Sequence, residues 1–469
     1  MHVSNLLYQV EHLQGLNPTT RTLVFTAKNQ NLIFSVPLVG SIVGAAVAPI
    51  LTARLGRKWP LVVAYLLSFG GIFLQIFAPN MVAFVMGRFW NSIVMGIAMS
   101  TAPLYLAEVV PASIRGATVT SMNILNLVAG VISTFTVYGT QHRSDALSYQ
   151  IPLAVQFALP AILIPLTLFI PESPQWYISK GRMDEARANL RKLRAFSDAE
   201  VDDELRVMKL SEENERLLTA DVKFWDIFNK ENIRRTITAG SIYSFNQCSG
   251  IILSTTYATV FLTQIGAGDP FTLTVISSVC VLAGTILAPF VIDRVGRRPL
   301  ALIGMSLLLI IDIVAGGLAF NSSNRKSALV IAAVSFIFNF IWAASFYSLS
   351  NVLPSEIATM KLRNYTMAYT IGCSYVTAVV TTLAVPQLVS ADAGNLGAKT
   401  YLIFGGCMAF IIVFVYFFVP ETRNRSFAEI DEMYDAKIPM RHWRNFETSS
   451  EAKTATVRLS EKVISSEHV

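Results

Sequence analysis

Long runs without a charged residue are the feature that most constrains this chain. The stretches 29–53, 59–87 and 270–292 contain no Asp, Glu, Lys or Arg. Each is long enough for a membrane-spanning helix, which needs about 20 apolar residues. Charged residues make up only 14% of the 469 residues, and 44 of the 68 lie in two segments, 172–235 and 421–469. This distribution excludes a soluble enzyme, a nucleic-acid-binding protein and a disordered chain. It predicts an all-α, polytopic protein of the lipid bilayer.

The charge-free runs predict eleven spans. Their expected bounds are 31–53, 59–79, 82–106, 117–139, 152–170, 239–262, 271–292, 299–319, 327–350, 366–388 and 400–419. Lys and Arg gather in alternate short loops, which indicates that these loops face the cytoplasm. The chain therefore divides into five parts. These are a non-spanning segment (1–30), a bundle of five spans (31–171), a cytoplasmic linker with short helices (172–235), a bundle of six spans (236–420) and a cytoplasmic tail (421–469).

Three charged motifs of the first half recur roughly 245 residues later, and parallel repeats of this kind build many transporters. Arg54-Leu55-Gly56-Arg57 recurs as Arg294-Val295-Gly296-Arg297, and Pro171-Glu172-Ser173 recurs as Pro420-Glu421-Thr422. Glu108, followed by Arg115, recurs as Glu356, followed by Arg363. The positions of the repeated motifs relative to the spans imply two halves of six helices each, a 6+6 plan. One helix of the first half is then missing before residue 31. Either the gene product is incomplete, or the chain is a true eleven-span variant. We expect the 469-residue form to transport poorly.

The motifs resemble the sugar-porter branch of the major facilitator superfamily over residues 31–440. They are Gly87-Arg88, Pro103-Leu104-Tyr105-Leu106-Ala107-Glu108, Arg115-Gly116, Pro171-Glu172-Ser173-Pro174-Gln175-Trp176, and Pro420-Glu421-Thr422 with Glu429-Ile430-Asp431-Glu432-Met433 after it. The tail looks most like that of fungal sugar and α-glucoside permeases. The resemblance implies a major facilitator fold that moves a sugar across the plasma membrane by alternating access, with protons in the full-length form. A non-transporting sugar sensor on the same fold and a transport-inactive truncated form are the alternatives.

The resemblance also implies a substrate site of uncharged hydrogen-bonding and aromatic side chains, as a sugar requires. The matching positions are Asn123, Asn246, Gln247, Tyr257, Asn351, Ser374 and Tyr375. For each of them, a hydrogen bond between helices is the alternative role. No His lies in a predicted span, and the four Cys have no metal-ligand or disulfide spacing. We therefore expect no metal, no cofactor and no enzymatic activity.

Charged residues at the cytoplasmic ends of the spans form the second predicted site. They are Arg54, Arg57, Arg88, Glu108, Arg115, Glu172, Asp293, Arg294, Arg297, Glu356, Arg363 and Glu421. In the first half, Arg54 and Arg115 could pair with the acids, and the second half repeats the arrangement. In the family such networks lock the cytoplasmic side shut. Alternatively, the basic residues only set topology and the acids only cap helices.

Two charges, Arg88 of this set and Asp312, lie inside predicted spans rather than at their cytoplasmic ends. In proton-coupled members of the family, the residue that matches Arg88 faces an Asp on the first helix. Asp312 is the only acid deep in a span. Its helix is peripheral in the family plan, so we favour a role in helix packing over a role in proton relay.

Overall fold

The computed structural model describes residues 15–16, 23–24, 27–143, 145–194, 198–219, 223–257, 270–321, 325–389, 393–423, 425 and 427–446. Within them, ten helical segments are long and apolar enough to cross a membrane, and each overlaps one of the predicted spans. The predicted span 239–262 begins in a described helix, but residues 258–269 lie outside the described residues. Most of the predicted non-spanning segment 1–30 also lies outside them.

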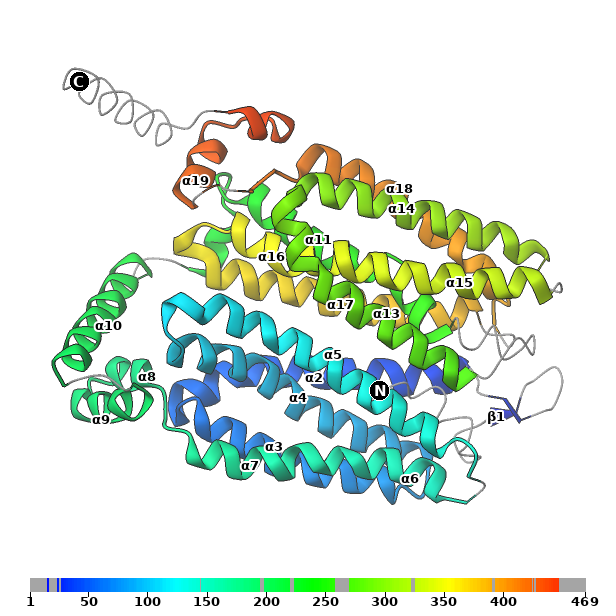
Figure 1. The fold of residues 1–469 in the computed structure, drawn as a ribbon, viewed down its shortest axis with the longest axis horizontal. Helices are drawn as coiled ribbons and strands as arrows, with labels where there is room; N and C mark the ends of the chain where they lie inside the picture. The colour runs from blue at the N-terminus through cyan, green and yellow to red at the C-terminus, as the bar shows by residue number, and fades with distance from the viewer. Residues whose placement is uncertain are drawn as a thin grey trace, which may run out of the picture.

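The first half is a bundle of five spans (Figure 1). Its helices are α2 (Ala27–Leu55), α3 (Lys58–Ile76), α4 (Met81–Val109), α5 (Ala112–Thr140), α6 (Leu147–Ala154) and α7 (Ala158–Phe169), with the short turn η2 (Val155–Phe157) joining the last two. A helix satisfies its own backbone hydrogen bonds, which lipid cannot do. Large apolar side chains on the outside, such as Val82 and Phe169, suit a lipid environment.

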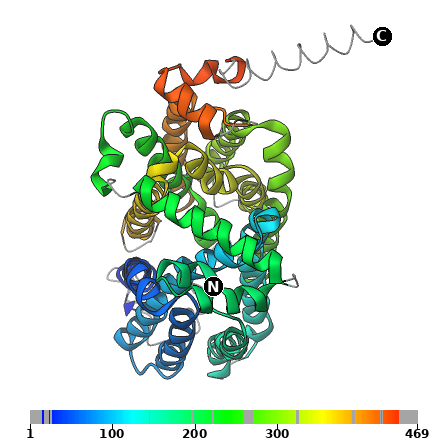
Figure 2. The ribbon, with the colours of Figure 1, turned by 90° about the vertical axis from the view of Figure 1, so that its left-hand side faces the viewer.

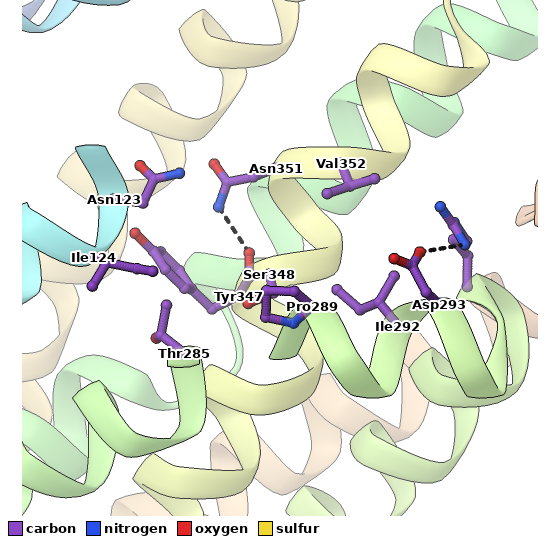
Figure 3. Close-up of a pocket in the computed structure, with 11 residues that line it drawn as sticks. Asn123, Ile124, Thr285, Pro289, Ile292, Asp293, Tyr347, Ser348, Asn351 and Val352 are labelled. Atoms are coloured by element: carbon purple, nitrogen blue, oxygen red, sulfur yellow. Dashed lines mark hydrogen bonds and ion pairs between the residues drawn. The ribbon is translucent and has the colours of Figure 1, made fainter. Parts of the chain in front are cut away.

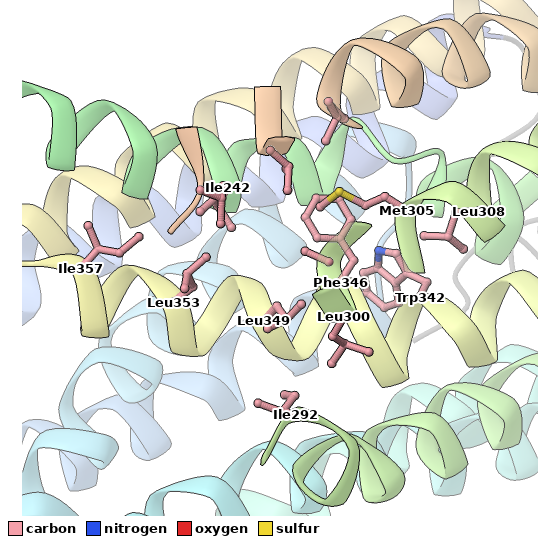
Figure 4. Packing of buried hydrophobic residues seen from close by; sticks show 14 of the residues in the cluster. Ile242, Ile292, Leu300, Met305, Leu308, Trp342, Phe346, Leu349, Leu353 and Ile357 are labelled. Carbon is pink, nitrogen blue, oxygen red and sulfur yellow. The ribbon is translucent and has the colours of Figure 1, made fainter. Parts of the chain in front are cut away.

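The second half repeats this plan around its own apolar core (Figures 1 and 4). Its helices are α11 (Ile233–Gln247), α13 (Pro270–Val295), α14 (Arg297–Leu318), α15 (Arg325–Trp342), α16 (Ser348–Ile357), α17 (Arg363–Val389) and α18 (Tyr401–Phe418), with the π-helical turns η4 (Leu253–Tyr257) and η6 (Ala343–Tyr347) and the short turns η5 (Ala319–Asn321), η7 (Met360–Leu362) and η8 (Gly397–Thr400). The core joins Met305 and Leu308 of α14 to Trp342 and Phe346.

The two halves pack together through two helix pairs, α2 with α17 and α5 with α13. Viewed from one end, the bundles lie one above the other (Figure 2). Between α5 and α13 the Thr134 and Ser278 hydroxyls lie 3.2 Å apart. Both residues are close to the helix ends that lie far from Arg57 and Arg297. The halves therefore contact each other at that far end.

Short helices gather at the opposite end, which we call the charged end (Figure 1). They are α8 (Pro174–Ser179), α9 (Met183–Leu193), α10 (Asp198–Thr219), η3 (Phe224–Phe228), α19 (Phe427–Asp435) and η9 (Met440–Asn445). The only strands among the described residues are β1 (Gly15–Leu16) and β2 (Leu23–Val24), which pair antiparallel. The predicted all-α membrane class is confirmed, and this two-residue pairing is a local addition to it.

Candidate substrate cavity and charged clusters

Glu172 organises the charged end of the first half. Its carboxylate accepts hydrogen bonds from the backbone N–H groups of Arg57 (2.8 Å), Lys58 (3.1 Å) and Ser173 (2.8 Å). The first two belong to the start of α3, where unpaired N–H groups and the helix dipole favour a negative charge. Glu172 therefore caps α3 from the segment that follows α7.

A second carboxylate, that of Glu108, completes the first cluster. The Arg57 guanidinium binds it through Nη2 and Nε at 2.7 and 2.9 Å, and the Ser173 hydroxyl donates to it at 2.5 Å. Glu108 lies near the end of α4 and is only 8% exposed. Such a two-point bond between Arg and a carboxylate is both strong and geometrically specific. We call this group, Arg57, Glu108, Glu172 and Ser173, the first cluster.

The second half builds the same group from the repeated motifs. Glu421 accepts from the backbone N–H groups of Arg297 (3.0 Å) and Arg298 (3.2 Å) at the start of α14. The Arg297 guanidinium binds Glu356 at 3.0 Å, and the Thr422 hydroxyl donates to Glu356 at 2.5 Å. We call Arg297, Glu356, Glu421 and Thr422 the second cluster. Asp293 adds an ion pair to Arg297 at 3.3 Å.

The predicted arginines differ in where they lie. Arg54 and Arg294 are exposed and form no ion pair among the described residues, because Arg57 and Arg297 make these contacts instead. Arg363 is half-buried at the start of α17, and burial lowers the pKa of its guanidinium against the opposing influence of Asp431. The side chain of Arg115 lies outside the described residues.

Arg88 lies within α4, away from both clusters. Its side chain is half-buried, and its Nε has no hydrogen-bond partner among the described residues. The sequence placed Arg88 in the charge network, whereas the described contacts of the first cluster do not include it. A charge at this depth needs a partner or water.

A cavity of about 180 Å³ lies between the two halves (Figure 3). Asn123 of α5 and Asn351 of α16 face it, and Asp293 and Arg297 line its charged end. The remaining lining residues are Ile124, Thr285, Pro289, Ile292, Tyr347, Ser348 and Val352. The cavity therefore runs from the middle of the helices toward the charged end, while α5 and α13 meet at the far end.

Asn351 is held in place from two sides. It donates to the Tyr347 backbone oxygen at 2.9 Å and accepts from the Tyr243 hydroxyl of α11 at 2.9 Å. Asn123 is exposed and makes no hydrogen bond among the described residues. These two amides, one from each half, leave donors and acceptors available to a ligand in the cavity.

Of the other predicted substrate residues, those whose side chains are described do not line the cavity. Asn246 is 4% exposed and donates to the Ser350 hydroxyl at 3.0 Å, which is a bond between α11 and α16. Gln247 is half-buried at the end of α11, with no hydrogen bond among the described residues. On α17, Ser374 is buried and Tyr375 is half-buried. The side chain of Tyr257 lies outside the described residues.

Sequence reasoning missed Tyr347, which lines the cavity, and Tyr243, which bonds to the cavity residue Asn351. Tyr243 lies within electrostatic reach of Tyr347 and Tyr375, so three helices bring phenolic groups to the same region. Tyr347 belongs to the π-helical turn η6, a feature often found at functional sites. One signal was available, since Tyr243 lies one helical turn before Gln247 in the same span. Among the described residues, no group of three or more His, Cys, Asp or Glu could hold a metal ion.

Comparison with known protein families identifies the family of this chain. A family model described as "Sugar (and other) transporter" matches residues 4–434. This chain belongs to that family. The match confirms the predicted sugar-porter assignment, and sugar transport on a major facilitator fold is the function that it supports. The charged motifs that carried the prediction all lie within the matched residues.

Curated fungal relatives match across most of the chain. The "Major facilitator-type transporter ecdD" of Aspergillus rugulosus is 29% identical over 435 residues, which cover 90% of this chain and 80% of the relative. The "General alpha-glucoside permease" of Saccharomyces cerevisiae is 29% identical over 86% of this chain and 67% of the permease. The "High glucose sensor RGT2" of the same yeast is 27% identical over 87% of this chain and 55% of the sensor.

Solved structures share the fold. The inward-open xylose transporter XylE from E. coli matches with a TM-score of 0.75 and 21% identity, over 92% of this chain and 95% of XylE. At this identity the likeness is one of fold. It confirms the predicted major facilitator architecture, in which the two helix bundles enclose a cavity between them.

Proposed function

We propose that this chain is a secondary transporter that moves a sugar across the membrane by alternating access. One observation carries the proposal: the cavity between the halves receives one amide side chain from each half, and hydroxyl side chains from the second half. A sugar carries no charge and offers many hydroxyl groups, so it is recognised by neutral donors and acceptors rather than by ions. A site shared by two bundles changes whenever the bundles move relative to each other.

Asn123 and Asn351 are the substrate contacts we favour, with Tyr347 as the aromatic wall. All three line the cavity, and Asn351 is oriented by its bonds to α11 and η6. Gln247, Ser374 and Tyr375 flank this region and are second choices. We assign Asn246 to helix packing, because its amide is buried against Ser350.

The two charged clusters act as internal braces. The first cluster joins the start of α3, the end of α4 and the segment after α7. The second cluster joins the start of α14, the end of α16 and the segment after α18. Each cluster therefore lies within one half. Their described contacts do not cross from one half to the other. This supports halves that move as rigid bodies, and the predicted lock of the cytoplasmic side stays a prediction.

The proposal also covers the coupling ion and the membrane in which the protein acts. The structural relative XylE is a proton:xylose symporter, and we propose that this chain is also coupled to protons. We also propose that it acts in the plasma membrane. A sugar sensor is the second candidate, supported by the similarity to the yeast glucose sensor.

Uptake of radiolabelled mono- and disaccharides by transporter-deficient yeast tests the proposal. We expect saturable uptake of at least one sugar, a result that would overturn the expectation from the sequence that the 469-residue form transports poorly. Asn123→Ala removes a cavity amide that no described residue binds, and should raise the apparent KM for that sugar about tenfold, equal to about 1.4 kcal/mol. Ser121→Ala is the matched control, because the Ser121 hydroxyl bonds to Thr118 within α5 and does not line the cavity.

The proposal fails if the protein reaches the cell surface and no sugar of the panel is taken up. Sugar-dependent gene induction without uptake would favour the sensor. Equal KM changes in Asn123→Ala and Ser121→Ala would remove Asn123 from the substrate site.

A further inference from the structure

Asp312 is a buried acid with no role in the cavity or the clusters. It lies in the membrane-spanning part of α14 and is 0% exposed. Neither of its carboxyl oxygens has a hydrogen-bond partner among the described residues. The sequence favoured a role in helix packing, yet no packing hydrogen bond is made. The group therefore needs another explanation.

An ionised carboxylate cannot remain in this position. Burial of an unpaired charge in an apolar interior costs far more than the addition of a proton from water. Acidic groups inside membrane proteins are expensive, and they commonly mark ion or proton pathways. In the conformation described here, Asp312 must therefore be a neutral acid that carries a proton.

Asp312 lies beside a break in the seventh span of the 6+6 plan, which is the span that begins with α11. Helix α11 ends at Gln247, and Gly250 adopts a φ of +84°, which L side chains rarely adopt. A Cβ placed on Gly250 would lie 3.8 Å from the Asp312 Oδ1, and one placed on Gly405 of α18 would lie 3.5 Å from the Asp312 Cβ. Asp312 therefore lies beside both the break and α18.

The titratable groups that face Asp312 come from α18. Tyr401 and Cys407 both lie within its electrostatic reach, and Cys248 at the α11 break interacts with Cys407. No charged side chain of the described residues balances it. Under these conditions a proton is the cation that can neutralise it.

A buried hydrogen-bond chain links this region to the segment after the break. The Tyr401 hydroxyl lies 3.0 Å from the Ser335 hydroxyl of α15, and Ser254 of η4 donates to the Ser335 backbone oxygen at 3.2 Å. All three residues are at most 1% exposed. Tyr401, which lies beside Asp312, is therefore connected to η4 through Ser335.

We propose that Asp312 is a proton-binding site whose occupancy is coupled to bending of the seventh span at Cys248–Gly250. Asp312 lies 15 residues after Arg297, about 22 Å from the charged end at 1.5 Å per residue. It therefore belongs to the far half of the membrane. Opening of the far end hydrates the carboxylate, which takes a proton from water. Closure of that end, as described here, buries the neutral acid. The proton leaves toward the charged end when bending at Cys248–Gly250 admits water from that side, and the emptied site then returns to the far side.

This inference rests on the proposed proton-coupled transport, and two assays separate them. In proteoliposomes, a pH gradient should drive sugar accumulation by the wild-type protein. Asp312→Asn mimics the neutral acid and should lose accumulation above equilibrium while it retains sugar counterflow, which needs no proton cycle. Asp312→Glu should retain part of the accumulation. Asp145→Asn, an exposed loop substitution, should behave as wild type.

Infrared spectroscopy of the purified protein tests the proton directly. The wild-type protein at neutral pH should show the C=O band of a buried protonated carboxyl, and Asp312→Asn should lack it. The inference is overturned if Asp312→Asn accumulates sugar like the wild type, or if the band persists in that variant. Absence of any sugar uptake by the wild type, with the band still present, would overturn the transport function and retain the protonated site.

Discussion

Two glycines turn the backbone where each basic loop meets its carboxylate. Gly56 has a φ of +91° and Gly296 a φ of +99°. A Cβ on Gly56 would lie 2.3 Å from the Glu172 Oε2, and one on Gly296 would lie 2.8 Å from the Glu421 Oε2. Both the backbone conformation and the close approach therefore require glycine.

Gly296→Ala should destabilise the second half. The left-handed backbone costs a non-glycine residue about 1–2 kcal/mol, and the methyl group must also displace the Glu421 carboxylate. We expect a lower midpoint of thermal unfolding in detergent. Gly317→Ala is the control, because a Cβ there meets nothing within 4 Å inside α14. A Gly296→Ala midpoint equal to that of the control would contradict the prediction.

For single residues, the sequence predicted which charged residues form the clusters better than it predicted which of them pair. It identified the Arg and Glu residues and their repetition in the second half. However, each basic motif contains two arginines, either of which could pair with the glutamates. Gly56 turns the chain between them, so Arg57 begins α3 and reaches Glu108 while Arg54 remains exposed at the end of α2. A backbone turn of this kind cannot be read from charge spacing. Tyr243 and Tyr347 were missed because a tyrosine in a span usually packs against neighbouring helices.

At the scale of the helix, Glu172 and Glu421 act as caps supplied from outside. Glu172→Gln removes the charge from the start of α3, and the loss of a partly buried charge–dipole contact should cost about 1–2 kcal/mol. Glu421→Gln should cost a similar amount at the start of α14, because the contacts are repeated. Thermal unfolding in detergent measures both. Glu185→Gln, at an exposed surface ion pair, is the control and should change little.

The contact between α9 and α10 should depend on pH. The hydrogen-bonded Arg187 guanidinium holds the pKa of Asp202 below its ordinary value, as Arg182 does for Glu185. A lowered carboxyl pKa stabilises the folded state above the unfolded pKa, and this stabilisation is lost as the pH falls through the folded pKa. The protection of the α10 amides against hydrogen exchange, relative to the intrinsic rate at the same pH, should therefore fall below about pH 4.

Asp202→Asn provides the test of that assignment. This variant should remove most of the pH dependence of α10 exchange, whereas Asp203→Asn, which makes no ion pair with Arg187, should retain it. An unchanged pH profile in Asp202→Asn would mean that other groups hold α10. Because both partners are exposed, the effect should be local and leave the membrane spans unaffected.

Across the whole molecule, the sequence predicted the spans well because length and hydropathy alone decide whether a helix can cross a bilayer. The relative position of the halves depends on small contacts that hydropathy does not record. Thr134 and Ser278 are ordinary residues in apolar helices, yet they bring α5 and α13 within hydrogen-bond distance across the halves. The open end of the cavity could not be read from the sequence for this reason.

That contact allows a direct test of alternating access. Thr134→Cys with Ser278→Cys, in a Cys280→Ala background, should form a disulfide under mild oxidant, because the two hydroxyl oxygens are already 3.2 Å apart. The bond would hold the far end closed while the cavity stays open at the charged end. Transport should stop on oxidation and return with dithiothreitol. Each single cysteine variant should keep its transport under oxidant. Full transport by the cross-linked protein would show that α5 and α13 need not separate, and would exclude the rigid-body movement proposed here.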